Sequence, residues 1–170
     1  MTRRLLLLGI LLQGDMHGYQ LNDYVSHAMG PYTDLKRPTA YYTLEKLEKD
    51  GCVQRETVRE GRRPERHVYR ITEKGRALFV DLLRSNLSSF THSLYADDFG
   101  VAFMDQVPDR EARRLLADKR DKVRAVLEQL QKLPGHGGNW RHVVTHNIAH
   151  LEAEVAWLDG LLSEPGEAEP

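Results

Sequence analysis

Two alternating segments on either side of an arginine-rich turn constrain the fold of this chain more than any other feature. Residues 52–58 (CVQRETV) and 67–72 (HVYRIT) alternate apolar and polar side chains, as half-buried strands do. Residues 59–66 (REGRRPER) are rich in turn-forming and charged types, so the segments predict a β-hairpin with a long polar tip. Because an isolated hairpin is barely stable in water, the residues around it must supply a covering layer.

Three predicted helices precede this hairpin and one follows it. Residues 3–12 are apolar on nearly every side, and residues 17–29 have apolar side chains at helical spacing. The third helix, capped by Thr39 and closed near residue 50, has Ala40, Leu44 and Leu47 on its inner face, and Thr72 is expected to cap the fourth. This order predicts a winged helix-turn-helix over residues 1–88, with the hairpin tip as the wing.

The second half of the chain is predicted to be helical. Residues 108–133 carry an apolar stripe that Lys119 interrupts, and residues 140–162 form a last amphipathic helix. Because two such helices do not bury both apolar faces alone, we predict that residues 89–163 form an antiparallel helical dimerisation and effector domain, followed by a disordered acidic tail over 164–170. The overall fold class is therefore mainly α, with an α+β winged helix. The expected dimer residues are Leu116, Val123, Leu127, Leu151, Val155, Trp157 and Leu158.

The start of the chain imitates a signal peptide without its processing site. Two arginines precede the apolar run 5–12, but no small-residue cleavage site follows, and the run is too short to span a membrane. The single cysteine, Cys52, excludes an intrachain disulfide and fits a reducing compartment. We predict a cytoplasmic protein that makes no membrane contact.

Charge is divided unevenly along the chain, although the formal net charge is −1. Residues 1–76 carry 14 Lys and Arg against 10 Asp and Glu, whereas residues 77–170 carry 10 against 15. The third predicted helix turns hydroxyl, phenol and ammonium groups outward, and the wing adds arginines, a set suited to DNA phosphates and base edges. For the wing alone, a solvated loop balanced by Glu60 and Glu65 is the plainer alternative. The predicted DNA-binding residues are His17, Tyr19, Thr39, Tyr41, Tyr42, Thr43, Lys46, Arg62, Arg63 and Arg66.

Four segments carry a family resemblance. HGYQL (17–21), AYYTLEKLEKDG (40–51) and YRITEKGR (69–76) resemble the PadR family of bacterial transcriptional regulators, and HNIAHLEAEVAWLDGLL (146–162) is similar to the helical domain of its longer, AphA-like subfamily. The resemblance implies a winged-helix dimer that binds an inverted repeat near a promoter, usually represses, and interlocks its C-terminal helices. Tyr41 matches a tyrosine of the family's Leu-Tyr-Pro segment, whereas Tyr42 stands where proline is common. Tyr41 is expected either to anchor its helix or to touch phosphate.

Aromatic residues of the second half are candidates for a small-molecule effector site. Members of the family often respond to aromatic or phenolic molecules, and flat rings stack well on aromatic side chains. Trp157, within a helix that must pack, is expected in the core or the dimer interface. The candidate effector residues are Tyr95, Phe99, Phe103 and Trp140.

A row of histidines and the lack of catalytic motifs complete the sequence-based predictions. His142, His146 and His150 recur every four residues, which suits either Zn²⁺ or Ni²⁺ binding or a polar helix face. No cysteine accompanies them, so we predict no metal and no cofactor. We find no phosphate loop, nucleophile elbow or metalloprotease pattern, so we predict that the chain is not an enzyme. A winged-helix protein-interaction module and a metal-responsive regulator are the alternatives to an effector-released DNA-binding regulator.

Overall fold

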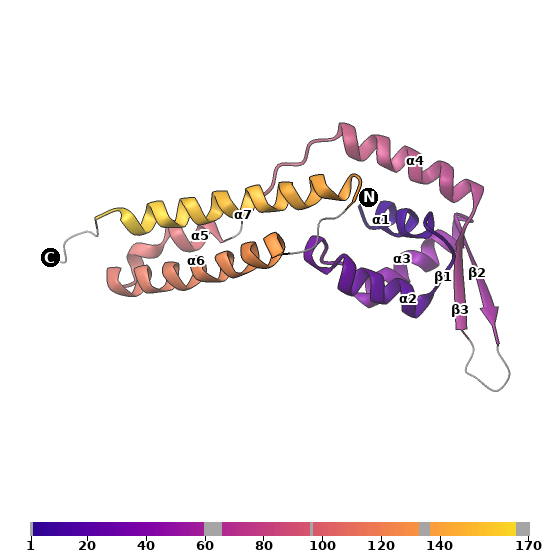
Figure 1. Ribbon diagram of the computed structural model, residues 1–170, viewed down its shortest axis with the longest axis horizontal. Coiled ribbons are helices and arrows are strands. Elements are labelled where there is room, and N and C mark those ends of the chain that lie inside the picture. The colour runs from indigo at the N-terminus through magenta and orange to yellow at the C-terminus, as the bar shows by residue number, and fades with distance from the viewer. Residues whose placement is uncertain (1, 60–65, 96, 133–136, 166–170) are drawn as a thin grey trace. The chain divides into compact units, whose positions relative to one another are not determined.

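The computed structural model describes residues 2–59, 66–95, 97–132 and 137–165. The chain divides into two compact units, Met1–His92 (unit 1) and Ser93–Pro170 (unit 2), and each is described by itself. Unit 1 combines helices with a small sheet, and unit 2 is helical (Figure 1). The last helix of unit 1 ends at Ser88, where the sequence predicted the domain boundary. Unit 1 itself continues to His92.

Unit 1 has the predicted order of helices around a hairpin. Its three-stranded antiparallel sheet has the order β1-β3-β2, and the hairpin register pairs Val53 with Ile71 and Val58 with Arg66. The elements are α1 (Thr2–Leu11), β1 (Met16–His17), α2 (Gly18–Asp23), the π-helical turn η1 (Tyr24–Ala28), the 3-10 turn η2 (Gly30–Tyr32), α3 (Arg37–Lys49), β2 (Val53–Val58), β3 (Arg66–Ile71) and α4 (Glu73–Ser88). The winged-helix prediction is confirmed.

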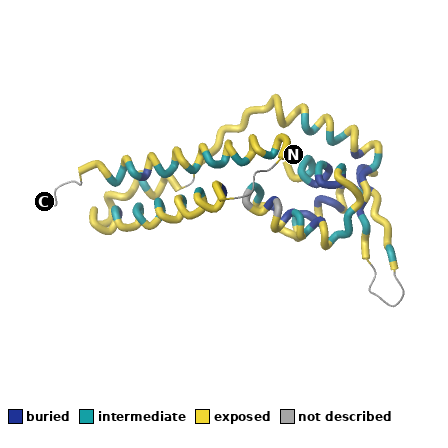
Figure 2. Tube along the Cα trace, in the orientation of Figure 1, coloured by how far each residue is buried: buried dark blue, intermediate teal, exposed yellow. Residues whose placement is uncertain are grey.

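One apolar core holds these elements together. It takes side chains from α1, α2, α3 and the inner face of the hairpin, and Figure 2 shows buried chain concentrated in this unit. The largest fully buried side chains of this unit are Leu7, Leu8, Leu11, Leu21, Leu44, Leu47 and Val53. The inner face predicted for the third helix, Ala40, Leu44 and Leu47, is confirmed.

Two local features of unit 1 differ from the sequence-based prediction. Met16 and His17 form the short strand β1 beside β3, whereas the sequence predicted only a helix break there. A two-residue strand shows no alternation and exists because β3 offers it a free edge. The helix predicted over residues 17–29 is divided into α2 and η1, and η2 follows it. The Met29 amide donates to the Tyr24 carbonyl at 3.1 Å, the spacing of a π-helical turn.

The start of α3 also corrects the prediction that Thr39 caps this helix. The N-cap residue is Lys36, which makes no side-chain capping hydrogen bond, and α3 begins at Arg37. Pro38 falls in the first turn, where its missing N–H would have no partner in any case. Thr39 is therefore a helix residue, and its carbonyl accepts a hydrogen bond from the Thr43 hydroxyl at 2.7 Å.

The junction of α4 with the hairpin depends on Thr72 and Gly75. The Thr72 hydroxyl accepts a hydrogen bond from the Gly75 amide at 3.0 Å, which confirms the predicted N-cap, and it donates to the Gly51 carbonyl at 2.8 Å. A Cβ atom on Gly75 would lie 2.0 Å from the Cys52 carbonyl oxygen. The glycine that disfavours a helix by propensity is thus the residue that lets α4 pack against the hairpin.

Unit 2 consists of α5 (Asp98–Ala102), the 3-10 turn η3 (Met104–Gln106), α6 (Asp109–Lys132) and α7 (Trp140–Ser163). Helices α6 and α7 run antiparallel, as Figure 1 shows, because the beginning of one contacts the end of the other. Arg113 donates to the carbonyl oxygens of Leu162 at 3.0 Å and Glu164 at 2.6 Å, and Arg124 pairs with Asp159 at 2.7 Å. Of the tail predicted over 164–170, residues 166–170 lie outside the described residues.

Candidate nucleic-acid interface

The outer face of α3 presents a phenol and an ammonium group side by side. Tyr42 is 57% exposed, and Lys46, one helical turn later, lies with its Nζ atom 4.7 Å from the centre of the Tyr42 ring. The two residues follow from the inner-face pattern, because positions 42 and 46 lie on the side of the helix opposite buried Ala40, Leu44 and Leu47. Together they offer one positive charge and one phenolic hydroxyl to an anionic surface.

Thr43 does not belong to this exposed face, which corrects the prediction that it points outward. Its side chain is 8% exposed, and its hydroxyl is bonded to the Thr39 carbonyl within the helix. Position 43 lies beside Ala40 and Leu44 on the helical surface, and a threonine can be buried there because it satisfies its hydroxyl locally. Thr39 is half-buried and lies at the edge of the outer face.

Tyr41 anchors α3 against the beginning of α2. Its ring packs on the core of unit 1, and its hydroxyl oxygen lies 3.0 Å from the position that a Cβ atom on Gly18 would occupy. The Arg37 guanidinium carbon lies 5.6 Å from the centre of the Tyr41 ring. Of the two roles left open for Tyr41, the packing geometry favours anchoring. Apart from the glycine itself, no sequence pattern predicts the close approach at Gly18.

A stack of side chains links the start of α2 to the base of the wing. The rings of His17 and Tyr19 are 5.6 Å apart and inclined by 16°, and the Arg66 guanidinium carbon lies 5.7 Å from the Tyr19 ring centre. Tyr19 is 56% exposed, so the stack stands at the surface. The His17 amide donates to Gln20 Oε1 at 2.9 Å, which fixes the first turn of α2. Three predicted residues are therefore neighbours, although 49 positions separate the first from the last.

The wing itself is described only at its two strands. Arg62 and Arg63, with Glu60 and Glu65, lie outside the described residues. Arg59 and Arg66, at the strand ends, are exposed. Across the hairpin, Thr57 Oγ1 and His67 Nδ1 are 3.2 Å apart.

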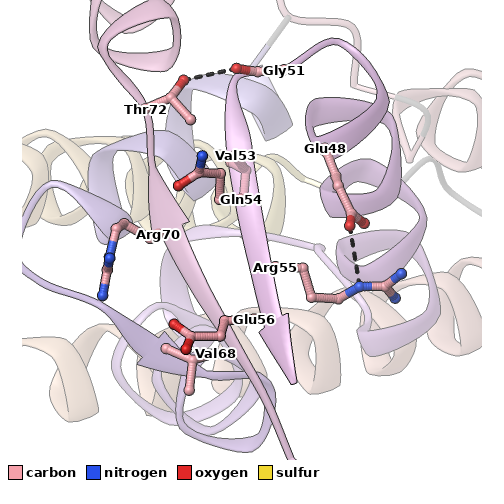
Figure 3. Close-up of a pocket in the computed structure, with 9 residues that line it drawn as sticks. All are labelled: Glu48, Gly51, Val53, Gln54, Arg55, Glu56, Val68, Arg70 and Thr72. Atoms are coloured by element: carbon pink, nitrogen blue, oxygen red, sulfur yellow. Dashed lines mark hydrogen bonds and ion pairs between the residues drawn. The ribbon is translucent and has the colours of Figure 1, made fainter. Parts of the chain in front are cut away.

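Two arginines of the hairpin are already paired with carboxylates. They border a surface hollow that Figure 3 shows in close-up, where Arg55 reaches the Glu48 carboxylate of α3 at 3.2 Å. Arg70 pairs with Asp15 at 2.8 Å, and this hydrogen bond raises the pKa of the Arg70 guanidinium above its ordinary value. These pairs brace the hairpin against neighbouring segments, so we assign them to positioning the interface. Tyr69 of β3 lies opposite Arg55 in the hairpin register, and burial raises the pKa of its phenol above its ordinary value.

The four candidate effector residues lie in different environments of unit 2. Tyr95 lines one hollow beside α6 and α7, and Phe103 lines another between η3 and α6. Phe99 is 70% exposed, and Trp140, the first residue of α7, is half-buried. Lys119 borders both hollows and was not among the predicted effector residues. The sequence signal for such a role was the position of Lys119 within the apolar stripe, because a charged group among apolar residues needs partners of opposite charge.

The predicted dimer residues differ in how far they are buried within the chain. Leu158 is fully buried between α6 and α7 of the same chain, whereas Trp157 is 37% exposed. The remaining predicted residues, Leu116, Val123, Leu127, Leu151 and Val155, are half-buried. The larger exposed apolar side chains of unit 2 also include Leu115, Val126 and Val143.

Two of the three histidines in the predicted row make direct contact. His146 Nε2 and His150 Nε2 are 3.0 Å apart, whereas the Nε2 atom of His142 lies 3.4 Å from the Arg141 Nε atom. In the part of the chain that the structure describes, no group of three or more His, Cys, Asp or Glu residues is placed to hold a metal ion. Within the same residues, no helix is long and apolar enough to cross a membrane.

These features define unit 1 as a winged-helix domain whose third helix and wing base expose aromatic and cationic side chains. Residues 7–81 match the model of the transcriptional regulator PadR-like family. A curated relative, the negative transcriptional regulator PadR of Bacillus subtilis (strain 168), is 22% identical over 172 residues, covering 92% of this chain and 93% of the relative. The resemblance predicted from the sequence is confirmed, over residues 7–81 by the family model and over most of the chain by its likeness to this relative.

Solved structures extend the likeness over nearly the whole chain. Bacillus subtilis PadR in complex with operator DNA has a TM-score of 0.81 at 24% identity, covering 96% of this chain and 98% of that chain. The same protein in complex with p-coumaric acid has a TM-score of 0.75 at 21% identity, covering 94% and 93%. The Vibrio cholerae virulence activator AphA has a TM-score of 0.71 at 20% identity, covering 95% and 96%. At these identities the likeness shows the fold, and the relatives belong to a class of proteins that are not enzymes.

Proposed function

We propose that this chain is a cytoplasmic DNA-binding repressor that binds an inverted-repeat operator as a homodimer and is released by an aromatic small molecule. The observation that carries the proposal is the exposed Tyr42–Lys46 pair on α3. The Tyr19–Arg66 stack adds a second aromatic and cationic pair at the base of an arginine-rich wing. Ammonium and guanidinium groups neutralise phosphates, and phenols donate to phosphate oxygens or base edges. The crystal structure of Bacillus subtilis PadR in complex with operator DNA supports this reading.

The dimer is proposed because unit 2 leaves apolar side chains of α6 and α7 in solvent. A two-fold dimer presents two copies of α3, and consecutive major grooves on one side of the duplex recur about every 34–36 Å. We therefore expect an operator whose half-sites are one or two helical turns apart. The aromatic effector is proposed from the exposed rings of unit 2, and the p-coumaric acid complex of Bacillus subtilis PadR supports it. An effector releases DNA only if it binds the two arrangements of the dimer with different affinity.

The double substitution Arg62→Ala with Arg63→Ala tests the DNA-binding role. Affinity is measured for a double-stranded fragment that the protein selects from a random pool, at several salt concentrations. We expect weaker binding and a slope of log K against log salt that is shallower by about 3.6, because the two chains of the dimer together lose four phosphate contacts. The matched control, Arg110→Ala with Arg114→Ala on α6, removes the same charge and should leave both quantities unchanged. Unchanged affinity in the wing variant, with the fold intact, would favour a protein-interaction module instead.

A metal-responsive regulator is the second candidate, and the 3.0 Å approach of His146 and His150 favours it. Two imidazoles one turn apart on a helix can share a transition metal ion. If this candidate holds, Zn²⁺ or Ni²⁺ raises the melting temperature or changes the DNA affinity, and His146→Ala removes the effect. If neither quantity responds to either ion, the histidine row is a polar helix face.

A further inference from the structure

A hollow in unit 2 combines aromatic walls with an excess of carboxylates. It has a volume of about 520 Å³ and lies where Tyr95, Asp97 and Asp98 meet Lys119 of α6 and both Glu154 and Trp157 of α7. This volume falls within the usual range for small-molecule sites. None of these residues belongs to the DNA-binding surface proposed above, so the hollow has a separate role to explain.

The hollow already surrounds one ammonium group, which belongs to the protein. The Lys119 Nζ atom lies 3.3 Å from Glu154 Oε1, 3.6 Å from Asp97 Oδ2 and 5.6 Å from the centre of the Trp157 ring system. The Lys119 side chain is 28% exposed and the Glu154 side chain 29%. Carboxylates together with an indole face are the chemistry that recognises ammonium ions in proteins.

The charge balance of the hollow decides which ligands suit it. Asp97, Asp98 and Glu154 carry three negative charges, Lys119 returns one positive charge, and His150 adds an imidazole to the lining. Asp97 is 80% exposed at its side chain, so it can take a second partner without leaving its place. An anionic ligand would have to draw Lys119 away from two carboxylates and then lie beside a third. A cationic ligand meets unneutralised charge directly.

We propose that this hollow binds an organic cation in which an ammonium group is joined to an aromatic ring through a short aliphatic link. The ammonium group lies among the carboxylates of Asp97, Asp98 and Glu154, and the ring lies against Tyr95 and Trp157. Lys119 then competes with the ligand for the same carboxylates and the same indole face. The inference rests on the proposed function only for the consequence of binding, since the ligand would be the effector of the regulator.

This competition gives a test with opposite signs for the two ligand charges. Lys119→Met keeps the aliphatic stem and removes the ammonium group, so the net charge of the hollow becomes more negative. The substitution should tighten the binding of a cation and weaken that of an anion. A site built for an aromatic acid would use Lys119 as its anion-binding group. In that case the wild-type chain binds the anion more tightly than the cation.

The probes are benzylammonium, benzyl alcohol and phenylacetate, which share one phenyl ring and differ in charge. Binding to the full-length chain without DNA is measured by calorimetry, and the change in indole fluorescence on binding is followed alongside it. We expect benzylammonium to bind about tenfold more tightly than phenylacetate, with benzyl alcohol between them. In Lys119→Met this ratio should grow.

A second variant keeps the test decisive if Lys119→Met fails to fold. Asp98→Asn removes a carboxylate from the hollow and should weaken benzylammonium severalfold, whereas the matched control Asp105→Asn in η3 should not. The inference is overturned if phenylacetate binds as tightly as benzylammonium, if no probe binds, or if Lys119→Met weakens the cation. Because DNA affinity is measured separately without ligand, a chain that binds DNA but prefers phenylacetate refutes this inference and leaves the proposed function standing.

Discussion

The two units bury their apolar side chains to very different extents. In unit 1, one cluster draws on every helix from α1 to α3 and on the sheet, and many of its side chains are fully buried. In unit 2, the buried apolar residues among those described are Ala112, Leu130 and Leu158, while Phe99, Phe103 and Val126 are largely exposed. Unit 1 is completed by its own chain. Unit 2 keeps apolar surface available for another molecule, a second copy or a ligand.

The two units also differ in net charge. Unit 1 carries 15 Lys and Arg against 11 Asp and Glu, whereas unit 2 carries 9 against 14. A self-sufficient core lets unit 1 hold Tyr42, Lys46 and Arg66 in fixed places for a polyanion. If the proposed effector binds unit 2, the incomplete core of this unit would let its packing change with the ligand. The predictions below test this difference between the units.

The largest expected difference comes from one substitution made once in each unit. Gly75→Ala should destabilise unit 1 by about 3 kcal/mol, because the new Cβ atom would meet the Cys52 carbonyl. Gly160→Ala, inside α7 with no other atom near the added Cβ, should stabilise unit 2 by about 1 kcal/mol. Hydrogen exchange of peptides from each unit measures both effects. A Gly75→Ala chain with unchanged protection would show that α4 does not pack on the hairpin as described.

Self-association should respond to the exposed apolar face of α6. Val126 is 47% exposed, so Val126→Asp should weaken the dimer by about 2 kcal/mol, or about thirtyfold in its dissociation constant, if a second chain covers this side chain. Sedimentation equilibrium measures the change. Gln131→Asp, on the same helix but about 140° around its axis from Val126, introduces the same carboxylate with the same change of charge at an exposed polar position and serves as the control. Equal association of both variants would remove this part of α6 from the proposed interface.

Helix capping offers a smaller contrast between the units. Thr72→Ala removes a hydroxyl that bonds to the Gly75 amide and the Gly51 carbonyl, and should cost about 1 kcal/mol. Asn139→Ala, at the N-cap of α7, should cost little, because the Asn139 side chain makes no capping hydrogen bond. Urea unfolding followed by circular dichroism compares them. A larger loss for Asn139→Ala than for Thr72→Ala would reverse the assignment.

The smallest expected effect concerns alkaline stability. Because burial raises the pKa of the Tyr69 phenol, the folded chain holds this proton at a pH where the unfolded chain has lost it. The stabilisation is complete below the ordinary tyrosine pKa of about 10 and is lost as the pH rises toward the folded pKa. Tyr69→Phe should therefore lose less stability above about pH 10 than the parent chain. The exposed Tyr42→Phe should follow the parent, and identical curves for all three would contradict the assignment.

Much of unit 1 was predictable from local pattern. The strands at 53–58 and 66–71 follow from alternation, and the inner face of α3 follows from spacing, because both patterns report which side is buried. What the pattern missed depends on contacts between distant segments. β1 exists because β3 is beside it, and Gly18 is required by the Tyr41 ring from another helix.

The candidate sites were predictable to different degrees for the same reason. Tyr42 and Lys46 follow from helical spacing, whereas Thr43 was assigned outward because a polar residue was taken for an exposed one. The Tyr19–Arg66 stack joins α2 to β3, and the Lys119–Trp157 contact joins α6 to α7. Neither pairing has a signal in the local sequence beyond the residues' own chemistry.

Lysine modification in the presence of DNA tests the central claim most directly. The full-length chain is acetylated with and without a saturating amount of its selected DNA fragment, and modification of Lys46 on α3 is compared with that of Lys122 on α6 by mass spectrometry. Lys46 should be protected by DNA and Lys122 should react at the same rate in both samples. If Lys46 reacts equally with and without bound DNA, the outer face of α3 is not in contact with the double helix, and the proposed mode of DNA binding is wrong.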